Sequence, residues 1–92
     1  MISRTVAVTN PLGMHARAAA RFVHTASAFV SQVRVARDAR VMDGKSIMGL
    51  LLLAAAPGAA ITISADGPDE TDAVDALCRL VERGFGEEPC SA

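Results

Sequence analysis

Residues 10–23 read NPLGMHARAAARFV, and within this stretch the pattern changes from that of a loop to that of a helix. Asn10, Pro11 and Gly13 are turn-forming residues, which predict a loop. From residue 16 onward apolar residues recur at helical spacing. The predicted buried face of this helix comprises Ala19, Phe22, Val23, Ala26 and Val30. Residues 2–9 alternate between apolar and polar, so the chain is predicted to begin as a half-buried strand, a loop and a helix.

The rest of the chain continues as short elements. Residues 32–35 alternate, residues 36–40 (ARDAR) are a polar turn, and residues 40–43 form a second short strand, so the two strands are predicted to form a hairpin. A short apolar helix follows Ser46 and ends at Pro57-Gly58. A strand at 59–66 precedes a final helix, which Asp69 is predicted to cap. The inward positions are Val33 and Val35, then Ile61, Ile63 and Ala65, and in the last helix Val74, Leu77, Cys78, Val81 and Phe85.

The predicted order of elements is therefore β-α-β-β-α-β-α. Short strands that alternate cleanly indicate a sheet with one wet face and one face covered by helices. The fold class is predicted to be α+β, an open-faced β-sandwich in which three helices cover one side of an antiparallel four-stranded sheet. A chain of 92 residues fits one small domain. This domain is expected at residues 1–86, followed by a short flexible tail at 87–92.

Composition argues against several classes of function. The net charge is −1 and the chain has no Trp or Tyr, so neither a basic field nor an aromatic platform favours nucleic-acid binding. Cys78 and Cys90 lack the number and spacing of a disulfide framework or a metal site, so reduced thiols and no metal or cofactor are predicted. No signal peptide is recognisable, and Pro57 interrupts the longest apolar run. A cytoplasmic protein without membrane attachment is expected.

His15 is the first candidate site residue, because it falls where the loop becomes a helix. It could simply cap the helix by a hydrogen bond. Alternatively it could carry a phosphoryl group, because the first amides of a helix have no internal partners and attract anions. The amides of Ala16 and Arg17 would then hold the negative charge, and the guanidinium of Arg17 would match the phosphate oxygens.

Ser46 is the second candidate. A serine before a helix is usually an ordinary N-cap. The same position also favours phosphorylation, since a phosphate at a helix N-terminus is stabilised locally. His24 lies on the polar face of the first helix and is interpreted as a solvated residue that could border a docking site.

The helix after Ser46 is apolar on every side, although only one side can face the sheet. Leu50, Leu53 and Ala54 form the predicted buried row. Met48, Leu51 and Leu52 should then be at least partly exposed, with Ile47 at the edge. Deep packing in the core is the alternative. An exposed apolar patch ringed by Arg17, Arg21 and Lys45 would instead mark a protein-docking surface.

Two stretches together resemble the histidine-containing phosphocarrier (HPr) family of the bacterial phosphotransferase system. GMHARAAARF, at 13–22, is similar to the family's Gly-x-His-Ala-Arg active-site pattern. KSIMGLLLLAAAPGAAITISADGPDE, at 45–70, is similar to its second signature. The resemblance extends from about residue 2 to residue 84, and the order of elements is that of the family's fold.

The resemblance implies that His15 accepts a phosphoryl group from phosphorylated enzyme I and passes it to an enzyme IIA domain. It implies that Arg17 steadies the group, and that the chain is a stoichiometric carrier rather than a true catalyst. Ser46 resembles the site of an HPr kinase/phosphorylase, whose phosphate would weaken docking to the acidic surface of enzyme I. A monomer is expected. The docking surface is predicted to comprise Met14, Ala20, Arg21, His24, Lys45, Ile47, Met48, Leu51 and Leu52.

Ala18 departs from the usual pattern, because sugar-transport members carry proline directly after the arginine. The run ARAAARF is more similar to proteobacterial relatives that serve a regulatory phosphotransferase chain, so a mannose-type or nitrogen-type enzyme IIA is the expected acceptor. A regulatory binding module switched by phosphorylation of Ser46 is the alternative. A small hydrolase using His15 and Ser46 is disfavoured, because the sequence offers no clear carboxylate to orient the histidine and no nucleophile elbow.

Overall fold

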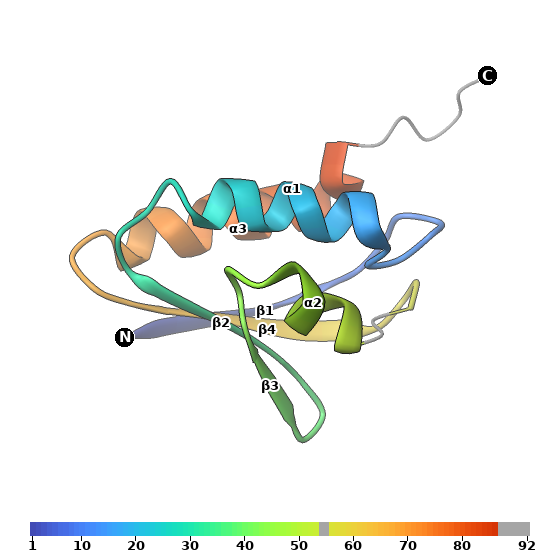
Figure 1. The fold of residues 1–92 in the computed structure, drawn as a ribbon, viewed down its shortest axis with the longest axis horizontal. Helices are drawn as coiled ribbons and strands as arrows, with labels where there is room; N and C mark the ends of the chain where they lie inside the picture. Colours follow the sequence, from blue (N-terminus) through green and yellow to red (C-terminus); the bar gives the residue numbers. More distant parts are fainter. Residues whose placement is uncertain (54–55, 87–92) are drawn as a thin grey trace.

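The computed structural model describes residues 1–53 and 56–86. Within these ranges the elements follow the predicted order (Figure 1). They are β1 (Ile2–Ala7), α1 (Ala16–Ala26), β2 (Gln32–Arg37), β3 (Arg40–Asp43), α2 (Ile47–Leu52), β4 (Ala60–Asp66), α3 (Glu70–Glu82) and a 3₁₀ turn, η1 (Gly84–Gly86). The predicted tail at 87–92, with Cys90, lies outside the described residues, as does Ala54.

The four strands form one antiparallel sheet in the order β1-β4-β2-β3. Helices cover one face of it, and α1 and α3 lie side by side across that face (Figure 1). The predicted α+β open-faced sandwich is confirmed. On the open face Thr5 and Thr62 sit opposite each other, and their hydroxyls form a hydrogen bond of 2.9 Å.

The core forms where the alternating strands meet the helical faces. The predicted inward residues of the strands are buried, among them Val33, Val35, Ile61 and Ile63. Phe22 of α1 is fully buried against them. Cys78 of α3 belongs to the same core, as predicted, and burial raises the pKa of its thiol.

Two predicted core positions are corrected in detail. Val30 is exposed, because α1 ends at Ala26 and the helical period no longer applies beyond it; Phe29 packs against the core instead. Phe85 is buried as expected but is not part of the last helix. α3 ends at Glu82, and Phe85 lies in η1 with a positive φ of 61°.

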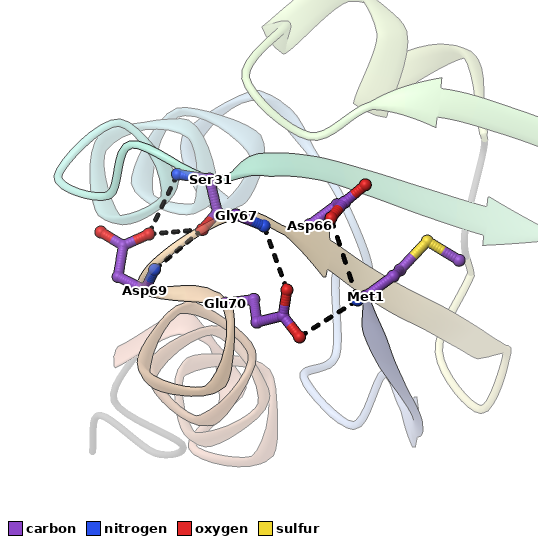
Figure 2. Close-up of polar contacts among 6 residues, drawn as sticks. All are labelled: Met1, Ser31, Asp66, Gly67, Asp69 and Glu70. Carbon is purple, nitrogen blue, oxygen red and sulfur yellow. Dashed lines mark hydrogen bonds and ion pairs between the residues drawn. The ribbon is translucent and has the colours of Figure 1, made fainter.

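Asp69 lies at the predicted N-cap of α3, but its carboxylate makes no capping hydrogen bond. It reaches instead across to the loop before β2, where it accepts from the amide of Val30 at 3.0 Å. It also accepts from the amide of Ser31 at 3.0 Å and from the Ser31 hydroxyl (Figure 2). Gly67 permits this approach, because a Cβ there would lie 2.7 Å from Cα of Ser31. The contact joins the loop before β2 to the loop before α3. It lies at the C-terminal end of α1, whereas His15 lies at the N-terminal end.

A second set of contacts beside this one holds the start of α3. Glu70 accepts a hydrogen bond from the amide of Gly67 at 3.1 Å and pairs with the ammonium group of Met1 at the same distance (Figure 2). The Gly67 amide is the main reason why the pKa of Glu70 is lowered. The start of α3 is therefore held by Glu70 rather than by the predicted Asp69 cap.

We expect the free energy of unfolding to depend less on pH in the acid range in Asp69→Asn than in wild type. The pKa of Asp69 is lowered, chiefly by the hydrogen bond from Ser31, so its stabilising contribution is complete above the unfolded-state pKa and is lost as pH falls through the lower folded-state pKa. Urea denaturation should show Asp69→Asn to be less stable than wild type at neutral pH. The difference should shrink in acid. Asp72→Asn, on the exposed face of α3, is the control, and a gap that stays constant with pH would contradict this account.

Candidate functional site

His15 is the N-cap residue of α1. Its backbone is extended, with φ −82° and ψ −179°, and its carbonyl accepts the first helical hydrogen bond from Ala19 at 2.8 Å. Its ring nitrogen Nδ1 accepts from the amide of Arg17 at 3.2 Å. A backbone amide can only donate, so Nδ1 bears a lone pair and a neutral ring carries its proton on Nε2. The unprotonated nitrogen therefore faces the start of the helix.

The loop before His15 is held by its own hydrogen bonds. Gly13 adopts a positive φ of 65°, and its carbonyl accepts from the amide of His15 at 3.0 Å and from the side chain of Asn10 at 2.8 Å. The Gly13 amide returns a hydrogen bond to the Asn10 carbonyl at 3.1 Å. Asn10 is itself buried. These bonds fix the backbone that presents His15, which is half-buried.

The surroundings of His15 favour a negative charge. The first turn of α1 contains no acidic residue, and Ala16 and Arg17 are both exposed there. Within residues 1–53 and 56–86 the Arg17 guanidinium forms no salt bridge with a carboxylate. A helix start that has an arginine and no acidic residue in its first turn favours an anion. Of the groups predicted to hold a phosphoryl group, the Arg17 amide contacts the ring directly.

Ser46 is the N-cap of α2, as predicted, and its hydroxyl accepts from the amide of Gly49 at 3.0 Å. Its own amide donates to the carbonyl of Asp43 at 3.1 Å. Gly49 suits this turn, because a Cβ there would lie 3.3 Å from the Ser46 hydroxyl. Ser46 is half-buried, and the first turn of α2 has no acidic residue.

Helix α2 exposes the apolar side chains that the sequence predicts. Leu50 and Leu53 are fully buried, whereas Met48 is 67% exposed, Leu52 55% and Ile47 43%. Leu51 is half-buried. Because α2 packs against α1, these side chains belong to the same part of the molecule as the helix that carries His15 (Figure 1). We call Ile47, Met48, Leu51 and Leu52 the α2 patch.

The other predicted docking residues differ in their surroundings. Met14 is a correction: it is only 5% exposed and packs in the core, because the loop turns it inward before His15. Ala20 and His24 are exposed on α1. Arg21 is also exposed, but it donates to the Phe85 carbonyl at 2.6 Å. Lys45 is half-buried and donates to the Phe29 carbonyl at 2.8 Å. Both cations therefore contribute to the fold through these hydrogen bonds.

Sequence reasoning missed two arginines of the β2–β3 hairpin. Arg37 donates to the carbonyl of Leu53 at 2.8 Å, and Arg40 donates to that of Leu52 at 2.9 Å. They were interpreted only as part of a polar turn. The signal that could have found them is their position. In the predicted hairpin two like charges face each other directly, and some other group must offset their repulsion.

In residues 1–53 and 56–86 there is no group of three or more His, Cys, Asp or Glu side chains placed to hold a metal ion. Over the same residues, no helix has the length and apolar character needed to cross a membrane.

Comparisons with known proteins point to one family. Residues 2–83 match the family model described as the PTS HPr component phosphorylation site. The phosphocarrier protein HPr of Cupriavidus necator is 48% identical over 95% of this chain and 98% of its own length. The HPr of Neisseria meningitidis serogroup A is 46% identical over the same shares. A crystal structure of HPr-C-His from Thermoanaerobacter tengcongensis is 45% identical and superimposes with a TM-score of 0.91, covering 96% of this chain and 99% of that one.

Proposed function

The chain belongs to the HPr family of phosphocarrier proteins of the phosphotransferase system, and on that premise we propose that His15 is its phosphoryl acceptor. The observation that carries the proposal is the hydrogen bond from the Arg17 amide to Nδ1 of His15. It keeps a lone pair on that nitrogen and aims it at the positive end of α1. Nδ1 is therefore the proposed nucleophile.

Phosphoryl transfer requires positioning and charge stabilisation more than it requires a catalytic base. The lone pair of Nδ1 forms a bond to phosphorus as the bond from phosphorus to the donor breaks. The Arg17 amide, which donates to Nδ1 before transfer, then donates to a phosphoryl oxygen. The amide of Ala16 and the guanidinium of Arg17 supply further donors at the same helix end.

The proposed donor is phosphorylated enzyme I and the proposed acceptor an enzyme IIA domain. The mannose or nitrogen type is favoured, because Ala18 stands where sugar-transport members have proline. Each partner must reach His15, so both use the same face, and the α2 patch with Ala20, Arg21, His24 and Lys45 is its proposed extent. Met14 is left out because it is buried. The proposed carrier is a monomeric cytoplasmic protein whose domain spans residues 1–86.

Reconstitution with phosphoenolpyruvate and enzyme I tests this proposal. The purified chain should gain one acid-labile, base-stable phosphate and should lose it when an enzyme IIA domain is added. Gel filtration with light scattering tests the monomer. A chain that takes up no phosphate from active enzyme I would contradict the proposed function.

We propose further that phosphorylation of Ser46 by an HPr kinase/phosphorylase regulates docking. The hydroxyl already accepts from a helix amide, so a phosphate there would be held by the start of α2 without unfolding it. The added charge would lie next to Ile47 and Met48. It would therefore change the surface that meets an acidic partner.

Ser46→Asp should slow phosphorylation by enzyme I about tenfold, the effect of roughly 1.4 kcal/mol of lost association. Ser46→Ala is the matched control, because it removes the hydroxyl cap without adding charge. Steady-state kinetics of both variants measures the difference, and equal rates would contradict a role for charge at this position. A pull-down with Ser46→Asp and wild type tests the alternative function, a binding module whose partners change with Ser46.

A further inference from the structure

Helix α2 depends on other parts of the chain at both ends. It has six residues, and helices this short are unstable without tertiary contacts. Ser46 caps its start. Its last turn contains no basic residue to complement the carbonyl end, where the helix dipole is negative. The guanidinium groups of Arg37 and Arg40 lie at this end instead, on the carbonyls of Leu53 and Leu52.

The placement of these two arginines needs a physical reason. Arg37 ends β2 and Arg40 begins β3, and the two are direct partners in the antiparallel register. Like charges directly opposite each other on a hairpin destabilise it. Here both guanidinium groups donate to the negative end of the same helix, which offsets their mutual repulsion. The tight turn between them places Asp38 at a positive φ of 54°.

We infer that Arg37 and Arg40 are positioning residues that fix the end of α2, and through it the α2 patch, for docking of the phosphoryl-transfer partners. The coupling is direct at Leu52, whose carbonyl accepts from Arg40 while its side chain is more than half exposed in the patch. The inference rests on the proposed function. It adds that the β2–β3 hairpin is part of the docking apparatus, although it lies on a different element from His15.

The test compares the double variant Arg37→Met/Arg40→Met with wild type. Methionine keeps an unbranched apolar stem and removes the charge and the donors. Arg34→Met is the matched control, because Arg34 is an exposed arginine of the same strand whose neighbours along β2, Val33 and Val35, face the core. The double variant Arg37→Lys/Arg40→Lys tests rescue by a cation of different geometry.

Three measurements are made on each variant. Amide hydrogen exchange at Leu50 and Leu53 reports the stability of α2, with α3 amides as the internal reference. Steady-state kinetics with phosphorylated enzyme I separates KM from kcat. Phosphorylation by phosphoramidate, a small donor that needs no docking surface, reports the acceptor site when it is read at His15 by peptide mass spectrometry, because the exposed His24 can react as well.

In Arg37→Met/Arg40→Met we expect the α2 amides to exchange about five- to tenfold faster than in wild type, as the loss of one or two hydrogen bonds at the helix end implies. KM for enzyme I should rise by a similar factor, with kcat and phosphoramidate labelling unchanged. Arg37→Lys/Arg40→Lys should recover part of both effects, and Arg34→Met should show neither.

A raised KM with unchanged exchange would overturn the inference, since the arginines would then contact the partner directly. Faster exchange with unchanged KM would overturn it as well. Failure of phosphorylated enzyme I to transfer a phosphoryl group to His15 of wild type would instead refute the proposed function.

Discussion

Replacement of His15 by asparagine is expected to abolish phosphoryl uptake from phosphoenolpyruvate and enzyme I. Asparagine is among the best N-cap residues, so its side-chain oxygen can accept from the Arg17 amide as Nδ1 does and the start of α1 should survive. The side chain has no ring nitrogen with a nucleophilic lone pair. The variant should therefore keep the fold, as judged by circular dichroism, and show no acid-labile phosphate in intact-protein mass spectrometry.

His24→Asn is the control for this experiment. His24 is an exposed histidine of the same helix, so the two substitutions have the same chemistry but differ in their position relative to the helix start. Because His24 belongs to the proposed docking face, the comparison uses the amount of phosphate taken up at completion. The His24 variant should then carry one phosphoryl group, as wild type does. If phosphate uptake persisted in His15→Asn and disappeared in His24→Asn, the acceptor would be His24, and the proposal for His15 would be wrong.

Introduction of a charge into the α2 patch should have the second largest effect. Met48 is the most exposed residue of the α2 patch, at 67%. Met48→Asp should therefore leave the folded chain nearly as stable as wild type. A carboxylate at the centre of an apolar interface would be desolvated against an acidic partner. We expect the dissociation constant for enzyme I to rise about a hundredfold, the loss typical of an interface hot spot.

Val41→Asp provides the comparison, since Val41 is 59% exposed and lies outside the α2 patch. On β3 it stands between Arg40 and Met42, so it points to the opposite face of the sheet and leaves the Arg40 contact with α2 in place. Isothermal titration calorimetry with enzyme I measures both variants, and phosphoramidate labelling checks that His15 is intact in each. Equal affinities of Met48→Asp and Val41→Asp would show that α2 is not the docking surface. The exposure of Met48 would then need another explanation.

Local features of this molecule could be predicted from the sequence because short-range physics decides them. The change from alternation to helical spacing after Gly13 places His15 at the helix start, and a serine before a run of leucines places Ser46 at an N-cap. The exposure of Met48 and Leu52 follows from geometry alone, because a helix on a one-sided sheet buries only one of its rows. These features needed no knowledge of tertiary contacts.

The remaining features depend on contacts between segments far apart in the chain. Asp69 carries the sequence signature of an N-cap, yet its carboxylate bonds to a loop 38 residues away. No local pattern distinguishes the two roles of this side chain. Arg37 and Arg40 look like ordinary charged turn residues until the sheet places their hairpin beside the end of α2. Met14 precedes an exposed site but is turned into the core by the loop that Gly13 shapes.

The phosphoryl group is proposed to reside on Nδ1 of His15, against the amides that open α1. We would examine the phosphorylated protein, labelled uniformly with nitrogen-15, by nitrogen-15 and phosphorus-31 NMR. We expect phosphorus bonded to Nδ1 of His15, with the backbone amide of Arg17 among the resonances that shift most. A phosphoryl group on Nε2, or on any other residue, would contradict it.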